Sequence, residues 1–250
     1  MQELARALQL LGAVVETECG TSLSELAART GIPVSSTSRT LDALCEEGLI
    51  ARSQHNRRYH VGSAALALAP DAVRRPFAVG YDEAMRLAQE CGERVIVSEL
   101  FGNQVVCTAV TEPRTWCGIN LFARVGQPMP MHASAAARIL LAYQPGAEVM
   151  DWLSQRPLTR FTARTPQTLE DVQRLLDVAR AREFAISYAE LQDGVWAVAA
   201  PIRSSTGQVC SGLTIAARAE RVEEAEQRSR LIGLVNEAAL RVSRGLGYVA

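Results

Sequence analysis

The sequence predicts an α+β protein built from two domains. Residues 22–61 give, in order, a short helix, a tight turn, a longer helix and two short strands around a basic tip. Residues 94–111 contain two β-rich runs on either side of a Gly-Asn turn, and helices and further strands follow. Strands joined by hairpins and separated by helices favour an antiparallel sheet with helices packed on it. A length of 250 residues also favours two domains.

The first domain is expected to begin with a helix at about residues 2–18, which Gly20 ends. Its apolar residues recur at helical spacing, and we expect them to pack under the two helices that follow. These residues are Leu4, Ala7, Leu8, Leu11 and Val15.

The next two helices have clear boundary signals. Ser22 or Ser24 caps the first of them, and Gly31 supplies the positive φ that stops it. Pro33 opens the second, at about residues 34–47, without removing a needed N–H group. The face predicted to point inward carries Thr37, Leu41 and Leu44.

This order of elements is that of a winged helix-turn-helix, which lays its second helix in the DNA major groove. Short hydroxyls and one arginine on the outer side of that helix suit phosphates and base edges. Residues 50–62 contain no acidic residue, so the arginines of the wing would lie against phosphates or reach into a minor groove. The predicted DNA-binding residues are Ser35, Ser36, Ser38 and Arg39 on the helix, and Arg52, Arg57 and Arg58 on the wing.

Two other interpretations of this domain stay open, namely a plain packing unit and a protein-binding adaptor. Residues 1–62 contain six Arg against seven Asp and Glu, so only the wing is one-sided in charge. The net charge of the whole chain is −1, so any DNA affinity must come from local patches and from dimerisation. DNA binding should weaken as salt rises, whereas an adaptor should show no salt-dependent DNA binding.

A linker of part helix and part turn is expected at residues 63–79, and the second domain follows it. The expected strands are residues 94–101, 104–111, 116–124, 184–188, 196–203 and 208–216. The expected helices are residues 84–91, which Gly92 ends, then 132–143, 147–155, 169–182 and 220–246.

The composition argues against metal, redox and membrane roles. None of the six Cys forms a CxxC pair or lies beside a His at ligand spacing, which favours free, buried thiols in a reducing cytosol. No apolar run approaches the length of a membrane span, and no signal peptide is visible. The sequence therefore predicts a cytoplasmic protein with no metal, no cofactor and no membrane partner.

Catalytic motifs are also missing, since there is no nucleophile elbow, P-loop, dinucleotide fingerprint or zinc-protease helix. His132 lies at a helix start, where we expect it to hold the turn by hydrogen bonds rather than act as a base. His55 and His60 lie on the wing with no carboxylate or Cys at metal spacing. Trp196 is either a stacking platform for an aromatic ligand or part of the core or an interface. No catalytic residue is predicted.

Three stretches share the pattern of a known family. The first includes Thr30-Gly31-Ile32-Pro33 and residues 44–50. The second, residues 125–142, contains Gly126, Pro130 and His132-Ala133, and the third joins residues 184–186 to Glu190, residues 194–202 and residues 213–215. In this order and spacing they resemble the IclR family of bacterial transcriptional regulators, over nearly the whole chain.

The resemblance implies a winged helix-turn-helix DNA-binding domain at 1–62, a linker at 63–79, and an effector-binding and oligomerisation domain with a GAF-like sheet at 80–250. It implies a homodimer or homotetramer that binds double-stranded operator DNA and is modulated by a small organic acid or an aromatic metabolite. By the same resemblance one wall of the effector pocket is Met129, Ala135 and Ala136, and the opposite wall is Ser187, Ala197, Thr214 and Ala216.

The leading hypothesis is therefore a ligand-responsive transcriptional regulator. The start of the helix after Met131 offers N–H groups that suit a carboxylate. Ala197 and Ala216 offer no side-chain hydrogen bond, however, so the implied pocket favours an apolar or aromatic ligand over a small oxoacid. The alternative is an enzyme that converts small molecules and carries a vestigial DNA-binding domain.

Overall fold

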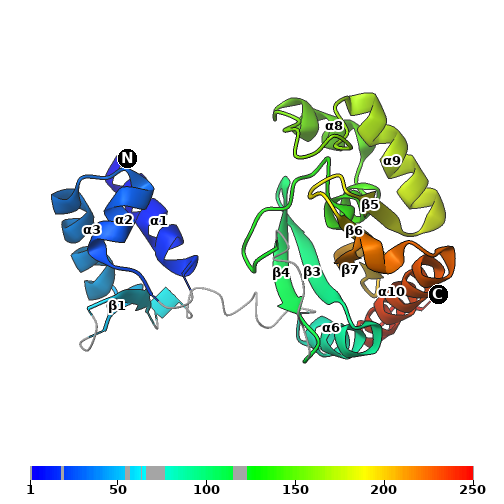
Figure 1. Cartoon of the computed structure of the whole chain (residues 1–250), viewed down its shortest axis with the longest axis horizontal. Coiled ribbons are helices and arrows are strands. Elements are labelled where there is room, and N and C mark those ends of the chain that lie inside the picture. Colours follow the sequence, from blue (N-terminus) through cyan, green and yellow to red (C-terminus); the bar gives the residue numbers. More distant parts are fainter. Residues whose placement is uncertain are drawn as a thin grey trace. The chain divides into compact units, whose positions relative to one another are not determined.

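The computed structural model describes residues 2–17, 20–53, 57–62, 64–65, 77–114 and 123–249. They fall into two compact units, one within residues 1–75 and the other within residues 76–250 (Figure 1). The predicted linker lies mostly outside the described residues, and its last three positions belong to a helix that begins at Phe77. The domain limits deduced from the sequence stay a prediction.

The first unit contains three helices and a two-stranded hairpin (Figure 1). The elements are α1 (Gln2–Val15), α2 (Leu23–Thr30), α3 (Val34–Glu46), β1 (Ile50–Arg52) and β2 (Tyr59–Val61). The two strands are antiparallel, with Ile50 opposite Val61. The predicted inward face of α3 is confirmed, because Thr37, Leu41 and Leu44 are all buried.

The predicted inner face of α1 is only partly confirmed: Ala7 and Leu11 are partly buried and pack against the core, but the other three residues do not. Leu4, Leu8 and Val15 are 67%, 61% and 55% exposed, whereas Leu10 and Val14 are buried in the core. This helix is apolar on two sides, so helical spacing alone does not decide which stripe the neighbouring helices cover. The helix also ends at Val15, short of residue 18.

The two ends of α2 are set by a side-chain cap and by a glycine with positive φ. Ser22, rather than Ser24, is the N-cap: its hydroxyl accepts the Glu25 N–H at 3.3 Å, and the Glu25 carboxylate accepts the Ser22 N–H at 2.8 Å. Gly31 closes the helix at φ +69°, as predicted. Pro33 is the N-cap of α3, so the turn between the two helices is only a few residues long.

The second unit is an antiparallel five-stranded sheet with helices on both faces (Figure 1). The strands are β3 (Arg94–Phe101), β4 (Gln104–Thr111), β5 (Ala185–Tyr188), β6 (Val195–Arg203) and β7 (Val209–Arg218), in the order β4-β3-β7-β6-β5. The helices are α6 (Phe77–Cys91), α7 (Ala135–Leu141), α8 (Gly146–Ser154), α9 (Leu169–Arg182) and α10 (Ala225–Gly245). The predicted α+β class is confirmed.

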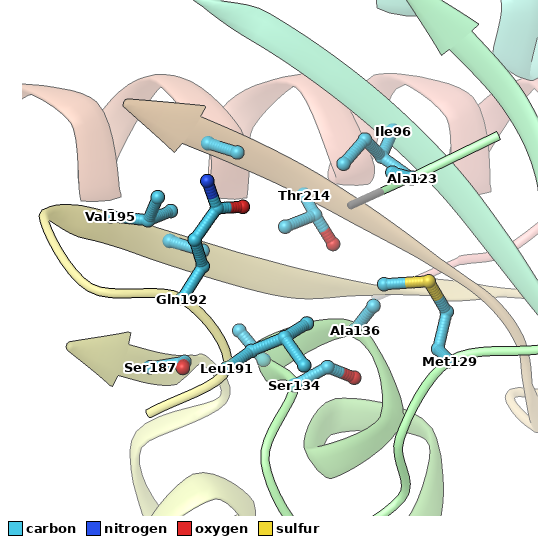
Figure 2. A pocket seen from close by; sticks show the side chains of 13 residues that line it. Ile96, Ala123, Met129, Ser134, Ala136, Ser187, Leu191, Gln192, Val195 and Thr214 are labelled. Atoms are coloured by element: carbon cyan, nitrogen blue, oxygen red, sulfur yellow. The ribbon is translucent and has the colours of Figure 1, made fainter. Parts of the chain in front are cut away.

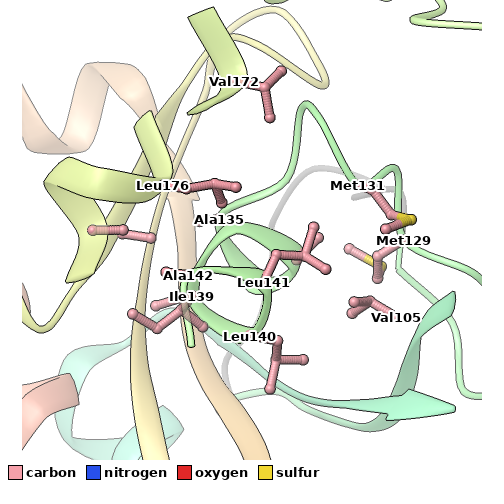
Figure 3. Close-up of a cluster of buried hydrophobic side chains, with 14 of the residues drawn as sticks. Val105, Met129, Met131, Ala135, Ile139, Leu140, Leu141, Ala142, Val172 and Leu176 are labelled. Carbon is pink, nitrogen blue, oxygen red and sulfur yellow. The ribbon is translucent and has the colours of Figure 1, made fainter. Parts of the chain in front are cut away.

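Each face of this sheet has its own apolar core. Helices α7, α8 and α9 supply the first core, which includes Ile139, Leu140 and Leu176 (Figure 3). Helices α6 and α10 supply the second, which includes Leu87 and Trp196. Trp196 is 1% exposed, so it belongs to this core and is not a stacking platform for a ligand.

Some boundaries differ from prediction. Helix α7 begins at Ala135, because residues 131–133 form a turn in which the Ser134 N–H donates to the Pro130 carbonyl at 3.1 Å. A 3₁₀ turn, Ala219–Val222, precedes α10, which therefore begins at Ala225 and not at residue 220. The predicted strand at 116–124 lies mostly outside the described residues, and its last two positions are not in a strand.

The described cysteines behave as inert apolar residues. Cys45, Cys91, Cys107 and Cys210 are free, and Cys19 and Cys117 lie outside the described residues. Burial raises the pKa of the Cys107 thiol to about 12 and that of Cys91 to about 11. Across the described ranges, no helix is both long enough and apolar enough to cross a bilayer.

Candidate functional site

The outer side of α3 carries the first candidate site. Ser35 and Arg39 are exposed, and Ser36 and Ser38 are partly exposed, because Thr37 and its neighbours on the inner face fix the rotation of the helix. Among the described residues, no ion pair involves Arg39. The structure thus brings the four predicted helix residues together on one accessible surface.

The three wing arginines differ in their surroundings. Arg58 donates to the Gly20 carbonyl at 3.1 Å and to the Glu25 carboxylate at 3.0 Å, so it ties the wing to the start of α2. Arg52 is exposed and lies over the Tyr59 ring, with its guanidinium carbon 5.2 Å from the ring centroid. Arg57 is exposed at the tip with φ +56°. Residues 54–56, including His55, lie outside the described part of the chain.

The base of the wing is tightly closed at Gly62. Its N–H donates to the Leu49 carbonyl at 2.9 Å, and a Cβ there would lie 2.1 Å from the Gly48 carbonyl oxygen. Only glycine fits so close to a neighbouring backbone. The hairpin therefore leaves the end of α3 in one direction, which sets where Arg52 and Arg57 point.

The second candidate site is a cavity of about 50 Å³ between the start of α7 and the sheet (Figure 2). Sheet register explains its floor: Ser187 pairs with Ala197, Ala197 pairs with Ala216, and Thr214 pairs with Ile96. All seven predicted effector-binding residues line this cavity, namely Met129, Ala135, Ala136, Ser187, Ala197, Thr214 and Ala216. Their role in binding stays a prediction.

Six further residues that line the cavity were not predicted from the sequence, namely Ile96, Ala123, Ser134, Leu191, Gln192 and Val195. Ile96 lies on the predicted hairpin, and only the pairing of β3 with β7 brings it beside Thr214. Leu191 and Gln192 lie in the segment between β5 and β6, which has no periodic signal. Alternation along β6 could have found Val195, because it lies two residues before Ala197.

No described residue that lines the cavity is charged, and the hydroxyl groups of its lining differ in their hydrogen bonds. Ser134 accepts the Ala137 N–H at 3.0 Å, and Ser187 donates to the Ala133 carbonyl at 2.9 Å. Thr214 is 2% exposed, and its hydroxyl has no hydrogen-bond partner among the described residues. An unpaired buried hydroxyl costs about 1–3 kcal/mol, so this group is available to a ligand or a water molecule.

Comparison with protein families identifies the family of the chain that carries these two candidate sites. Residues 82–244 match the family "Bacterial transcriptional regulator IclR C-terminal", and residues 3–54 match the "IclR helix-turn-helix domain". The chain belongs to the IclR family. The predicted function as a bacterial transcriptional regulator is confirmed, and DNA is its partner.

Curated IclR relatives match over most of the chain. The HTH-type transcriptional repressor AllR of Klebsiella pneumoniae is 28% identical over 98% of this chain and 90% of its own length. The HTH-type transcriptional regulator KipR of Bacillus subtilis is 28% identical over 91% of this chain and 90% of its own. Both IclR relatives are named as transcriptional regulators, which favours the regulator hypothesis over the enzyme alternative.

Solved IclR structures share the fold. The crystal structure of the Thermotoga maritima IclR matches with a TM-score of 0.78 at 24% identity, covering 99% of this chain and 100% of its own. An IclR homologue from Microbacterium hydrocarbonoxydans, solved in complex with 4-hydroxybenzoate, matches with a TM-score of 0.80 at 23% identity and covers 98% of both chains.

In this IclR chain the side chain of His132 contacts the loop that contains Thr159 and Phe161. Its Nε2 lies 2.9 Å from the Thr159 carbonyl oxygen, and its ring stacks on Phe161 with 5.7 Å between centroids. It thus holds a neighbouring loop rather than only its own turn. The described residues contain no group of three or more His, Cys, Asp or Glu placed to hold a metal ion.

Proposed function

We propose that this regulator binds operator DNA in the cytoplasm as a homodimer or homotetramer, and that a small organic molecule in the cavity changes its DNA affinity. The carrying observation is the cavity beside α7, which contains a buried hydroxyl with no partner among the described residues. A ligand shifts a regulator only by binding its conformations unequally. Apolar ligands are favoured, because the walls are mostly apolar, and an aromatic ring would enter this cavity of about 50 Å³ only if its walls move apart.

Footprinting on the DNA that flanks the protein's own gene tests this function. We expect protected sites whose occupancy changes when organic acids or aromatic compounds are added. The 4-hydroxybenzoate complex of an IclR homologue makes that compound a sensible member of the panel. Protected sites that no compound alters would leave a constitutive DNA-binding protein, and a complete lack of protection would contradict the proposal.

For the DNA interface we propose that α3 lies in the major groove and that the wing contacts phosphates. Ser35, Ser36, Ser38 and Arg39 are the accessible residues of α3, and they would contact bases and phosphates. Arg52 and Arg57 would contact the backbone. Arg58 would mainly position the wing, because Glu25 and the Gly20 carbonyl already hold it.

Replacing Arg39 by alanine is expected to weaken operator binding by about 1–3 kcal/mol and non-specific binding much less, because a base contact carries sequence information. Arg57→Ala should weaken both alike and reduce the salt slope by about 1. Fluorescence anisotropy at several salt concentrations measures both effects. Arg182→Ala removes an exposed arginine from α9 and serves as the control. Unchanged operator affinity in both DNA-binding variants would show that the placement is wrong.

The exposed stripe of α1 supports the oligomer. Leu4, Leu8 and Val15 are all more than half exposed on one side of this helix. A single α3 with few cations would bind weakly, and two copies on two half-sites would bind more tightly. We therefore propose that this stripe contacts α1 of a second copy.

Leu8→Glu is expected to shift the protein towards monomer by at least tenfold in dissociation constant, because it places a charge in an apolar contact. Sedimentation equilibrium measures that shift. Gln9→Glu adds the same charge at an exposed position on another side of the helix, and it should leave the oligomer unchanged. An unaltered oligomer in the Leu8 variant would exclude this contact.

A further inference from the structure

None of the described residues that line the cavity is charged, and this restricts the ligand that the cavity accepts. Arg138 follows the cavity-lining residues along α7, but it pairs with Glu190 and donates to the Ile186 carbonyl. The Ala137 N–H at the start of α7 is already bonded to Ser134, which leaves the N–H groups of Ala135 and Ala136 as the donors at this helix start. A carboxylate entering the cavity would therefore exchange its hydration for these two N–H groups, and it would meet no cationic side chain among the described lining residues.

Thr214 supplies a polar group on the sheet side. It lies on the central strand β7, between Ile96 of β3 and Ala199 of β6. Figure 2 shows its oxygen directed into the cavity. No described residue bonds to this oxygen, which leaves it free of the described residues and able to bond a ligand atom or a water molecule.

Gln192 supplies a second polar group on another wall. Its segment lies between Ala189 and Gly194, which have φ of +52° and +72°. The hydroxyls of Thr162 and Thr165 hold the segment by donating to the Ala189 and Glu190 carbonyls, both at 2.6 Å. The Gln192 side chain is thus presented to the cavity by anchored backbone (Figure 2).

We propose that the effector is an uncharged compound with an apolar body and a hydroxyl or similar group, and that Thr214 recognises this group. Gln192 contributes a second hydrogen bond from the facing segment. The inference rests on the proposed function, and it names the chemical class of ligand that the same cavity takes. Anionic ligands are disfavoured relative to their neutral counterparts.

The test uses phenol, toluene and benzoate as probes, with calorimetric titration of the full-length protein and of Thr214→Val. Phenol has a hydroxyl group where toluene has a methyl group, and threonine has a hydroxyl group where valine has a methyl group. Thr214→Val is expected to weaken phenol binding about tenfold relative to its effect on toluene, because only phenol loses a hydrogen bond. Thr214→Ser should restore phenol binding. Wild-type protein should bind benzoate at least tenfold more weakly than phenol.

A matched control separates recognition from folding. Thr111 is another buried threonine on the sheet, but its hydroxyl donates to the Ala84 carbonyl at 3.0 Å. Thr111→Val should lower the melting temperature and leave phenol affinity unchanged. Thr214→Val should not lower the melting temperature, because no hydrogen bond with a described residue is lost.

Several outcomes would overturn the inference. They are an equal effect of Thr214→Val on phenol and toluene, tighter binding of benzoate than of phenol, and no binding of any probe. The footprinting experiment tests the proposed function independently of these outcomes. A footprint that responds to another compound, with the same response in Thr214→Val, would leave the proposed function intact and remove only this assignment.

Discussion

Replacing Arg138 by methionine is expected to lower the free energy of unfolding of the second unit by about 3–5 kcal/mol. The side chains of Arg138 and Glu190 are only 3% and 13% exposed, and the two groups form an ion pair. Methionine fills similar space, but it leaves the carboxylate of Glu190 buried without its cation. Differential scanning calorimetry measures the loss.

Two further variants make this prediction specific. Arg174 pairs with Asp171 at the surface, where the side chains are 72% and 42% exposed. Arg174→Met should therefore cost less than about 1 kcal/mol. Adding Glu190→Gln to Arg138→Met removes the unpaired buried charge, and it should recover a large part of the lost free energy of unfolding. Equal losses for Arg138→Met and Arg174→Met would show that the buried pair has no special role.

Replacing Gly62 by alanine is expected to abolish specific DNA binding while leaving the second unit folded. The added Cβ would lie 2.1 Å from the Gly48 carbonyl oxygen and 2.9 Å from the Ile50 nitrogen, and both are backbone atoms that cannot rotate away. Overpacking of this kind costs about 1–3 kcal/mol or more, and the strain falls where the wing leaves α3. Anisotropy with operator DNA measures the loss.

Gly146→Ala is the matched control, since a Cβ there meets nothing within 4 Å. It lies at the start of α8, where alanine is a better helix former than glycine. That variant should keep wild-type DNA binding and equal or slightly higher stability. Normal operator affinity in Gly62→Ala would mean that the wing does not need its observed direction.

Elements defined by local backbone chemistry could be predicted from the sequence. The Gly-Asn turn defines the hairpin of β3 and β4, whose bounds match the prediction. Gly31 and Gly92 both have the positive φ that ends a helix, at +69° and +73°. These signals lie within a few residues of the feature that they determine, so no tertiary information was needed.

Features set by distant contacts could not be predicted in this way. Helix α1 has apolar residues on two sides, and only packing against its neighbours buries Leu10 and leaves Leu8 exposed. Seven cavity residues came from the family resemblance, but Gln192 lies on a segment without periodicity, and Ile96 joins only through strand pairing. The unpaired state of the Thr214 hydroxyl depends on every atom around it.

The pleat of β6 has a consequence for how the protein can be observed. Val195 and Ala197 line the cavity, whereas Trp196 between them points to the opposite face and is 1% exposed. A ligand that displaces this strand also alters the surroundings of an indole that is shielded from solvent. The chain thus carries its own optical reporter one residue from the cavity, and intrinsic fluorescence can follow occupancy without a label.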